Sequence, residues 1–79
     1  MMSEPIVVYG ADWCGDCIRA KRVLDRREVD YVWVDLEAHP NKAEEARRIG
    51  RSTRIPVVRF PDGTVMVEPP PDELESRLS

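Results

Sequence analysis

The sequence predicts an α/β fold, a four-stranded mixed sheet with flanking helices in the order βαβαββα. Short apolar runs at residues 6–9, 31–36 and 55–60 have the length and composition of buried strands. The segments between these runs repeat apolar residues at helical spacing, as the helices of an α/β domain do. A Pro-Asp-Gly turn at residues 61–63 follows the third run and predicts a hairpin, whose returning strand is antiparallel.

The first strand is predicted at residues 6–9, a β-branched run. A helix is expected to begin near Gly15, because apolar residues then recur on one stripe. The stripe consists of Cys17, Ala20 and Leu24, with Val23 beside them. This periodicity turns Cys17 toward the core and leaves Cys14, which precedes the first turn, exposed.

The second strand is predicted at residues 31–36, which are apolar on both faces except at Asp35, as expected of a strand in a covered sheet. A second helix opens near Pro40, and Gly50 is expected just past its end. Its inner face is expected to carry Ala43, Ala46 and Ile49. A strand–helix–strand unit of this kind has a right-handed crossover and parallel strands.

The third strand, residues 55–60, and the fourth, residues 64–67, form the predicted hairpin. The prolines at residues 69–71 stop the fourth strand. A short helix follows, in which the negative charges of Asp72 and Glu73 suit the first turn. Its buried edge is expected to consist of Leu74 and Leu78.

The chain has 79 residues, so we expect one domain, residues 1–79. A disulfide between its two cysteines would close a four-residue ring and remove little chain entropy. The pair is therefore better suited to a reactive role than to a structural disulfide. No segment has the pattern of a signal peptide, and no run approaches the roughly 20 apolar residues of a membrane span. We expect a cytoplasmic monomer without a membrane partner.

Charge is dense and mixed, with 12 basic and 15 acidic residues and a net charge of −3. A nucleic-acid-binding domain would carry a basic excess on one face, so the composition argues against a nucleic-acid partner. Basic residues cluster at residues 19–27 and 47–54. Because acids are interleaved with them, solvated helix faces explain these clusters better than binding patches.

Cys14-Gly15-Asp16-Cys17 stands between the first strand and the first helix. Two thiols at this spacing can close a small disulfide ring, and the unpaired N–H groups of a helix start favour a thiolate at the first cysteine. The spacing therefore predicts a thiol–disulfide exchanger in which Cys14 reacts with the substrate and Cys17, buried below Cys14, is the second thiol. The Asp16 carboxylate either opposes the Cys14 thiolate by like-charge repulsion or is a helix-start acid without a redox role.

Pro56 stands at the start of the third predicted strand, although it lacks the N–H donor that a ladder requires. A cis Ile55–Pro56 bond is one explanation, because it turns the backbone groups of Ile55 outward. An ordinary trans proline at a strand edge is the other.

The strand–Cys-X-X-Cys–helix start, together with an Ile-Pro pair before a hairpin, resembles the glutaredoxins. Residues 9–17 (YGADWCGDC) and 31–37 (YVWVDLE) look most like the mycoredoxins, the actinobacterial glutaredoxin-like proteins that use mycothiol. Residues 54–64 (RIPVVRFPDGT) extend the match, so the similarity covers almost the whole chain.

The resemblance implies the thioredoxin fold, a cis Pro56, Cys14 as the nucleophile, Cys17 as the partner thiol and Ile55 as a backbone contact for a bound thiol. No tightly bound cofactor is implied. The cosubstrate is a low-molecular-weight thiol, mycothiol in preference to glutathione, and the partners are oxidised or S-thiolated client proteins and a flavin disulfide reductase. The candidate cosubstrate-binding residues are Trp13, Asp16, Arg54, Ile55 and Pro56.

The chain departs from the usual glutaredoxin pattern in four places. Asp16 stands where an aromatic residue is usual, Ala11 where a basic residue is frequent, and Arg54 where threonine is common. Residues 68–70 (EPP) replace a Gly-Gly pair that helps to hold the γ-glutamyl end of glutathione. The last departure favours a different small thiol and leaves the exchange chemistry intact.

Trp13 and Arg54 have two interpretations each, and His39 has one. Trp13 is either an apolar wall beside Cys14 or a core residue. Arg54 either meets a carboxylate of a bound thiol or of a partner, or is solvated as most arginines are. His39 has no carboxylate or cysteine neighbour that would make it a base, so it is interpreted as a helix-start residue.

Two other functions compete with this interpretation. A redoxin-type electron donor that thioredoxin reductase supplies, such as one serving ribonucleotide reductase, would use the same pair of cysteines. A metal site needs more ligands than one Cys-X-X-Cys provides, so a dimer that pools two pairs would be needed to hold zinc or a [2Fe–2S] cluster. No metal site is therefore predicted within one chain.

Overall fold

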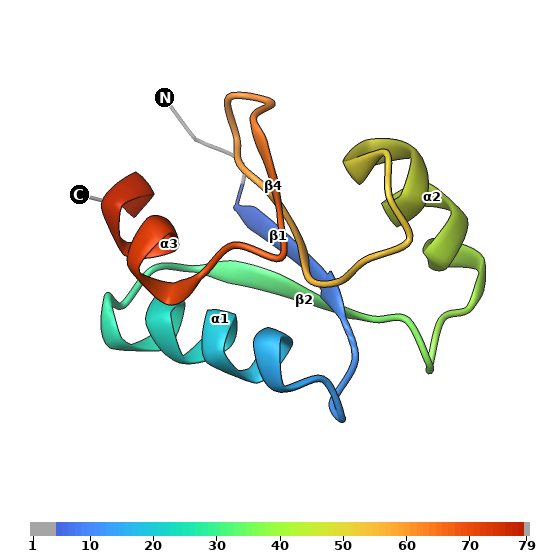
Figure 1. Ribbon diagram of the computed structural model, residues 1–79, viewed down its shortest axis with the longest axis horizontal. Helices are drawn as coiled ribbons and strands as arrows, with labels where there is room; N and C mark the ends of the chain where they lie inside the picture. Colours follow the sequence, from blue (N-terminus) through green and yellow to red (C-terminus); the bar gives the residue numbers. More distant parts are fainter. Residues whose placement is uncertain (1–4, 79) are drawn as a thin grey trace.

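The computed structural model describes residues 5–78, which form seven elements (Figure 1). They are β1 (Ile6–Gly10), α1 (Gly15–Arg26), β2 (Tyr31–Asp35), α2 (Asn41–Gly50), β3 (Val57–Arg59), β4 (Val65–Val67) and α3 (Pro71–Leu78). The βαβαββα order predicted from the sequence is confirmed.

The four strands form one mixed sheet in the order β2-β1-β3-β4. β1 and β2 are parallel, with Val8 opposite Trp33. β3 lies antiparallel to both β1 and β4, and its Val58 stands opposite Val8 on one side and Met66 on the other. The expected parallel first pair and the expected closing hairpin are therefore both present.

Side chains alternate between the two faces of the sheet, and the helices are divided unequally between these faces. α1 and α3 pack together on one face, called the α1 face below, and α2 covers the other, called the α2 face (Figure 1). The buried cluster on the α1 face consists of Ile6, Val8, Ala20, Val23, Leu24, Val58, Phe60 and Leu74. The buried cluster on the α2 face consists of Tyr9, Ala46 and Val57.

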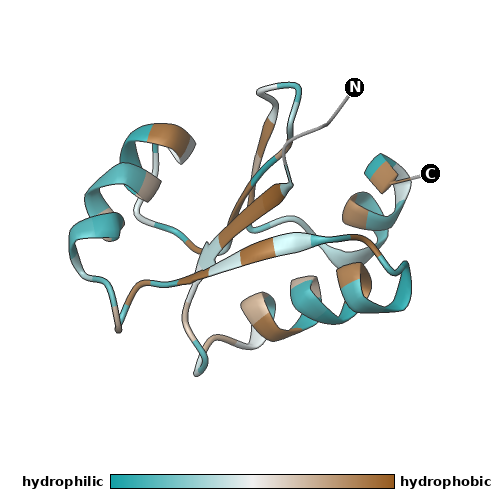
Figure 2. Ribbon diagram, turned by 180° about the vertical axis from the view of Figure 1, so that it is seen from behind, coloured by the Kyte–Doolittle hydropathy of each residue, from teal (hydrophilic) through white to brown (hydrophobic). Residues whose placement is uncertain are grey.

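Hydropathy follows this arrangement. Figure 2 shows apolar residues along the central strands and mostly polar residues on the outward surfaces of the helices. In α1 the buried residues recur at helical spacing, so the predicted apolar stripe is confirmed and carries Cys17 into the core. Within residues 5–78, no helix is long and apolar enough to cross a membrane.

Some boundaries and one strand environment differ from the prediction. β3 begins at Val57 and not at residue 55, because a proline at residue 56 cannot donate to the ladder. α2 includes Gly50, and Arg51 takes the left-handed capping position with a φ of 53°. The prediction that the second strand is covered on both faces is wrong, because β2 is an edge strand on which Val32 is 45% exposed.

Candidate active site

Cys14 lies at the N-terminus of α1, directly after the turn that leaves β1. The turn closes through a hydrogen bond of 3.2 Å from the Cys14 N–H to the Ala11 carbonyl. Cys14 has an extended backbone (φ −84°, ψ 115°), and its Sγ accepts a hydrogen bond from the Cys17 N–H at 3.3 Å. The sulfur therefore takes the place of a capping oxygen, where backbone donors and the helix dipole stabilise negative charge.

Cys17 lies one turn along the helix and is fully buried, whereas Cys14 retains 9% exposure. The prediction of an inward-facing Cys17 is confirmed. The prediction of an exposed Cys14 is wrong, because both cysteines form a buried cluster with Ala11 against which Trp33 and Ile55 pack. Both thiols are free.

The two thiols lie in different chemical environments. Burial raises the pKa of the Cys17 thiol to about 12, with a hydrogen bond to Cys14 as the next cause and the negative charge of Asp16 as a smaller one. A thiol in apolar surroundings favours its neutral form. Cys17 is therefore protonated at neutral pH, while the Cys14 sulfur accepts a hydrogen bond from a backbone N–H.

The loop before β3 brings a third component to the cysteines. The Ile55–Pro56 bond is cis, as the resemblance implied, and Pro56 is buried. The Ile55 carbonyl oxygen lies 4.0 Å from Cys14 Sγ, although these residues are 41 positions apart. Behind the loop, the Pro56 carbonyl accepts a hydrogen bond from the Glu68 N–H at 2.9 Å. A segment far along the chain thus forms one wall of the thiol site.

Asp16 is not an isolated carboxylate. It forms a hydrogen-bonded ion pair with Arg19, one turn later on the exposed side of α1. The same guanidinium lies over Gly15, 3.5 Å from the position that a Cβ there would occupy. The prediction that Arg19 belongs to a solvated basic cluster misses its ion pair beside the two cysteines. The i, i+3 spacing of Asp16 and Arg19 could have predicted this pair.

The remaining candidates lie at the rim. Trp13 is 69% exposed, so it is an outward-facing ring next to Cys14 and not a core residue. Arg54 is exposed, and its guanidinium lies 3.5 Å from the Glu68 carboxylate. His39 is exposed just before α2, in keeping with a helix-start residue. Among residues 5–78, no three histidine, cysteine, aspartate or glutamate side chains gather as a metal site.

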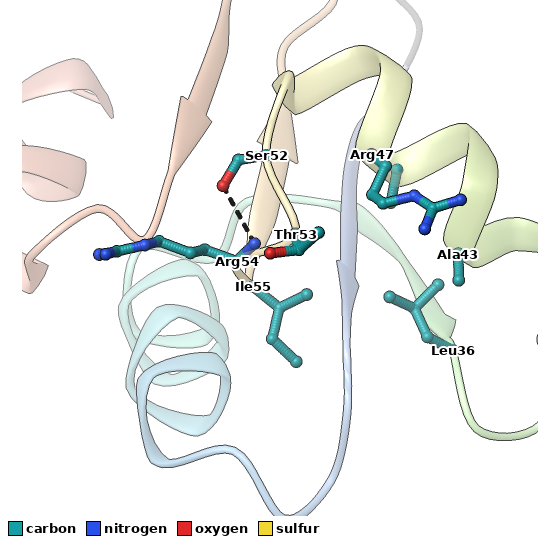
Figure 3. A pocket seen from close by; sticks show the side chains of 8 residues that line it. Leu36, Ala43, Arg47, Ser52, Thr53, Arg54 and Ile55 are labelled. Carbon is teal, nitrogen blue, oxygen red and sulfur yellow. Dashed lines mark hydrogen bonds between the residues drawn. The ribbon is translucent and has the colours of Figure 1, made fainter.

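A pocket of about 230 Å³ opens beside this loop (Figure 3). It is lined by Leu36, Ala43, Ala46, Arg47, Ser52, Thr53, Arg54 and Ile55. The Ser52 hydroxyl accepts a hydrogen bond from the Arg54 N–H at 3.0 Å, and the Arg54 side chain extends away from Leu36 and Ala43. Because Ile55 also packs against the cysteine cluster, the pocket adjoins the thiol site.

A thiol pair at a helix start, facing a cis-proline loop on this sheet, defines the class of thiol–disulfide oxidoreductases with a thioredoxin fold. The comparison with protein families narrows the class, since the glutaredoxin family model matches residues 6–66. The chain belongs to the glutaredoxin family and is a thiol–disulfide oxidoreductase. Members of this family use a low-molecular-weight thiol as cosubstrate.

Two relatives in sequence support the assignment. A provisionally named glutaredoxin of Mycobacterium tuberculosis is 32% identical over 79 residues, which cover 99% of this chain and 94% of the relative. A glutaredoxin of Pseudomonas aeruginosa is 42% identical over 55 residues, or 68% of this chain and 64% of the relative. The first similarity extends over nearly the whole chain, as the quoted motifs predicted.

Two solved structures have the same fold. The crystal structure of a glutaredoxin from Archaeoglobus fulgidus matches with a TM-score of 0.82 at 23% identity, covering 98% of this chain and 87% of that one. NrdH-redoxin from Escherichia coli, described as a glutaredoxin-like protein with a thioredoxin-like activity profile, matches with a TM-score of 0.80 at 28% identity and covers 96% of both chains. The predicted thioredoxin fold is confirmed.

Proposed function

We propose that the protein reduces mixed disulfides on client proteins, with Cys14 as the nucleophile, Cys17 as the partner thiol and mycothiol as the preferred electron donor. The placement of Cys14 Sγ carries the proposal. The sulfur accepts the Cys17 N–H at 3.3 Å, a contact that favours a thiolate. It also lies 4.0 Å from the Ile55 carbonyl oxygen, which puts the reacting atom against the backbone of the proline loop.

The cycle begins when the Cys14 thiolate attacks the small-thiol sulfur of a protein mixed disulfide. A bond forms between that sulfur and Cys14 Sγ, the bond to the client breaks, and the client thiolate takes up a proton. A second small thiol then attacks the adduct, which yields a small-molecule disulfide and free Cys14. In the other route, Cys17 attacks Cys14 Sγ, which releases the small thiol and leaves an internal disulfide for a reductase.

The burial of Cys17 supports the first route. A thiol with a pKa of about 12 supplies little thiolate at neutral pH, so the internal attack is slow unless the environment of Cys17 changes. We therefore assign Cys14 an essential role and Cys17 a dispensable one in turnover that a free small thiol supports.

Variants of the two cysteines test these roles. Cys14→Ser is expected to abolish turnover of an S-thiolated protein, because no nucleophile remains. Cys17→Ser is expected to retain the route that uses a free small thiol. Release of the small thiol from the client, followed by mass spectrometry, measures both variants, and exchange by Cys14→Ser would contradict the assigned roles.

The charges around the proline loop favour mycothiol over glutathione. Glutathione carries two carboxylates and an ammonium group, which a binding site matches with opposite charges. At this rim the Arg54 guanidinium is already opposed by the Glu68 carboxylate, 3.5 Å away. Mycothiol is a sugar-based thiol without those charges, and the half-buried side chain of Ile55 and the exposed ring of Trp13 offer it apolar walls, while the buried Pro56 holds the loop behind them. In this proposal, the Asp16–Arg19 pair faces the open side of the site.

The decisive experiment supplies each small thiol as the sole reductant of a mixed-disulfide substrate. We expect faster turnover with mycothiol than with glutathione. Glu68→Gln, which leaves Arg54 without its counter-charge, is expected to raise turnover with glutathione and to leave turnover with mycothiol unchanged. The matched control is Asp62→Asn, which breaks the ion pair between Asp62 and Arg77, 2.9 Å long, at the β3–β4 turn. Faster turnover with glutathione in the unaltered protein would refute the choice of mycothiol and leave the oxidoreductase assignment intact.

A second function is favoured by the similarity to NrdH-redoxin, which is described as having a thioredoxin-like activity profile. A protein of that type would receive electrons at an internal Cys14–Cys17 disulfide, directly from thioredoxin reductase. A coupled assay with thioredoxin reductase, run beside a mycothiol recycling system, distinguishes the two functions. Rapid reduction by thioredoxin reductase, with no turnover on either small thiol, would replace the first proposal with the second.

A further inference from the structure

The indole ring of Trp33, in β2, lies against the thiol of Cys17. The two groups meet at Gly10, where an added Cβ would lie 2.5 Å from Cys17 Sγ, 2.9 Å from Trp33 Cη2 and 3.1 Å from Trp33 Cζ3. The Cys17 sulfur and the edge of the Trp33 ring therefore both lie next to the Cα of Gly10, in the space that any larger side chain at that position would need. Trp33 is also the largest side chain that packs against the cluster of Ala11, Cys14 and Cys17.

Lys21 covers the face of the same ring. Its Nζ lies 4.0 Å from the ring centroid, which is within the range of a cation–π interaction. Lys21 follows Cys17 by four residues in α1, so the ammonium group and the thiol lie on the same side of the helix. The ring is thus held between the thiol at its edge and a cation on its face.

These contacts account for the environment of Cys17. The titratable and charged groups near it are Cys14 and Asp16 at the start of α1 and Lys21 one turn later. β1 contributes Gly10 and β2 contributes Trp33, neither of which is charged. Burial is the largest cause of the raised pKa of the Cys17 thiol, and Trp33 packs against the buried cluster that contains this thiol.

We propose that Trp33 is a positioning residue whose ring, held by Lys21, keeps water from Cys17 and slows the attack of Cys17 on a Cys14 adduct. The adduct then persists until a second small thiol reaches it. This inference rests on the proposed function, because it concerns the fate of that adduct.

The step that Trp33 governs is an internal exchange. A bond forms between Cys17 Sγ and Cys14 Sγ, and the bond from Cys14 Sγ to the small thiol breaks. The small thiol leaves with the bonding electron pair and takes up one proton, which balances the proton that Cys17 loses. No outside oxidant or reductant enters this step.

The test follows the internal disulfide after reduced protein is mixed with excess 2-hydroxyethyl disulfide, an uncharged probe. Rapid acid quenching and mass spectrometry separate the Cys14 adduct from the internal disulfide across the neutral to alkaline range. In Trp33→Thr, which removes the ring and introduces a β-branched residue that suits a strand, the pH profile of the internal step is expected to move down by about one unit. The rate at neutral pH should rise about threefold, because about ten times more thiolate is partly offset by its lower nucleophilicity.

Val32→Thr is the matched control, since it introduces the same residue one position earlier, where the side chain is 45% exposed. This control should leave the pH profile unchanged. Trp33→Phe keeps an aromatic ring and should lie close to the unaltered protein. If Trp33→Thr does not fold, Trp33→Leu repeats the test with a smaller apolar side chain.

A Trp33→Thr profile that coincides with that of Val32→Thr overturns the inference even if the variant is less stable, because a ring that merely fills the core changes stability and not the pH profile. If the unaltered protein forms neither a Cys14 adduct nor an internal disulfide with the probe, the proposed function fails and this inference fails with it. An internal disulfide that forms without an adduct accumulating first overturns this inference alone. An adduct with an unshifted profile overturns this inference alone.

Discussion

The two faces of the sheet are packed differently. The α1 face carries most of the buried side chains, and the pocket that adjoins the thiol site lies on the α2 face. Among the residues that the structure describes, eight buried side chains form the cluster under α1 and α3. Three form the cluster under α2, the single helix on the other face. The pocket beside the thiol site opens next to α2. Burial is concentrated on the α1 face, and the pocket that adjoins the thiol site lies on the face with fewer buried side chains. A second pocket, of about 510 Å³, opens away from the cysteines at the edge of the α1 face, beside Ile6 and Phe60.

The candidate active site draws on both faces. Cys17 belongs to α1 and shares the tight packing of the α1 face. Ile55 belongs to the loop that follows α2, beside the pocket. The buried thiol of Cys17 is therefore supported by the densely packed α1 face. The backbone of Ile55, which is proposed to contact a ligand, lies beside the less densely packed α2 face.

The largest difference between the α1 face and the α2 face is expected when one core residue on each face is truncated to alanine. Leu24 is fully buried on the α1 face, so Leu24→Ala is expected to lower the free energy of unfolding by about 3 kcal/mol through lost burial and a cavity. Ile49 packs half-buried on the α2 face, and Ile49→Ala should cost about 1.5 kcal/mol. Urea unfolding measures both losses. Equal losses would show that the two faces contribute alike.

The order of the elements was predictable because it depends on patterns between near neighbours in the sequence. The stripe of α1, the hairpin turn before β4 and the Cys14–Cys17 spacing each occupy a few consecutive turns or residues. Such local patterns also placed Cys17 on the inward face before any tertiary contact was known. The Asp16–Arg19 pair has an equally local signal, the i, i+3 spacing, which was overlooked.

The features that the sequence did not predict depend on residues that are distant along the chain. Cys14 is covered by Trp33 and Ile55, and no local pattern shows that either side chain will reach it. The opposition of Arg54 and Glu68 likewise joins a loop to the end of β4. Periodicity describes one element at a time, so it cannot show which elements meet.

Gly10 tests how tightly the α1 face holds the partner thiol. A Cβ at this position would approach Cys17 Sγ to 2.5 Å and Trp33 Cη2 to 2.9 Å, so one of these groups must move. Gly10→Ala is expected to lower the free energy of unfolding by about 2 kcal/mol and to change the rate of internal disulfide formation. The measurement is urea unfolding of the reduced protein, together with the acid-quench assay.

Gly15→Ala is the matched control for this substitution. A Cβ at Gly15 would meet the flexible end of Arg19 at 3.5 Å, an ordinary contact distance. Its effect on the free energy of unfolding should stay within about 0.5 kcal/mol. If Gly10→Ala is as stable as this control, Cys17 and Trp33 can move without cost, and the conclusion that the α1 face holds Cys17 tightly is wrong.

The hydrogen bond between Tyr9 and Glu45 fastens α2 to the sheet on the thinly packed face. The Tyr9 hydroxyl donates to Glu45 Oε2 at 2.6 Å. Burial and then this bond raise the pKa of Tyr9 from 10 to about 12, and the same bond lowers the pKa of Glu45. The stabilisation from Tyr9 is therefore present below pH 10 and lost between pH 10 and about 12, whereas that from Glu45 is lost in acid, as the pH falls below its ordinary pKa.

Tyr9→Phe is expected to cost about 1 kcal/mol at neutral pH. It should also remove the part of the alkaline loss of stability that Tyr9 causes. Urea unfolding at a series of pH values measures both effects. Tyr31→Phe is the control, because its hydroxyl donates to Asp25 at 3.0 Å on the exposed surface, and its cost should be smaller. An alkaline stability curve of Tyr9→Phe that runs parallel to that of the unaltered protein would contradict the assignment.

The smallest effect is expected at Val32, where β2 forms the edge of the sheet and the side chain is 45% exposed. Val32→Thr keeps the β-branched shape that suits a strand, so its effect on the free energy of unfolding should stay within about 0.5 kcal/mol. A loss as large as that of Ile49→Ala would mean that something covers this end of the α2 face, and a second copy of the chain along the open edge is the simplest cover. Unfolding at two protein concentrations then decides the matter, because a loss that arises from association changes with concentration and a loss within one chain does not.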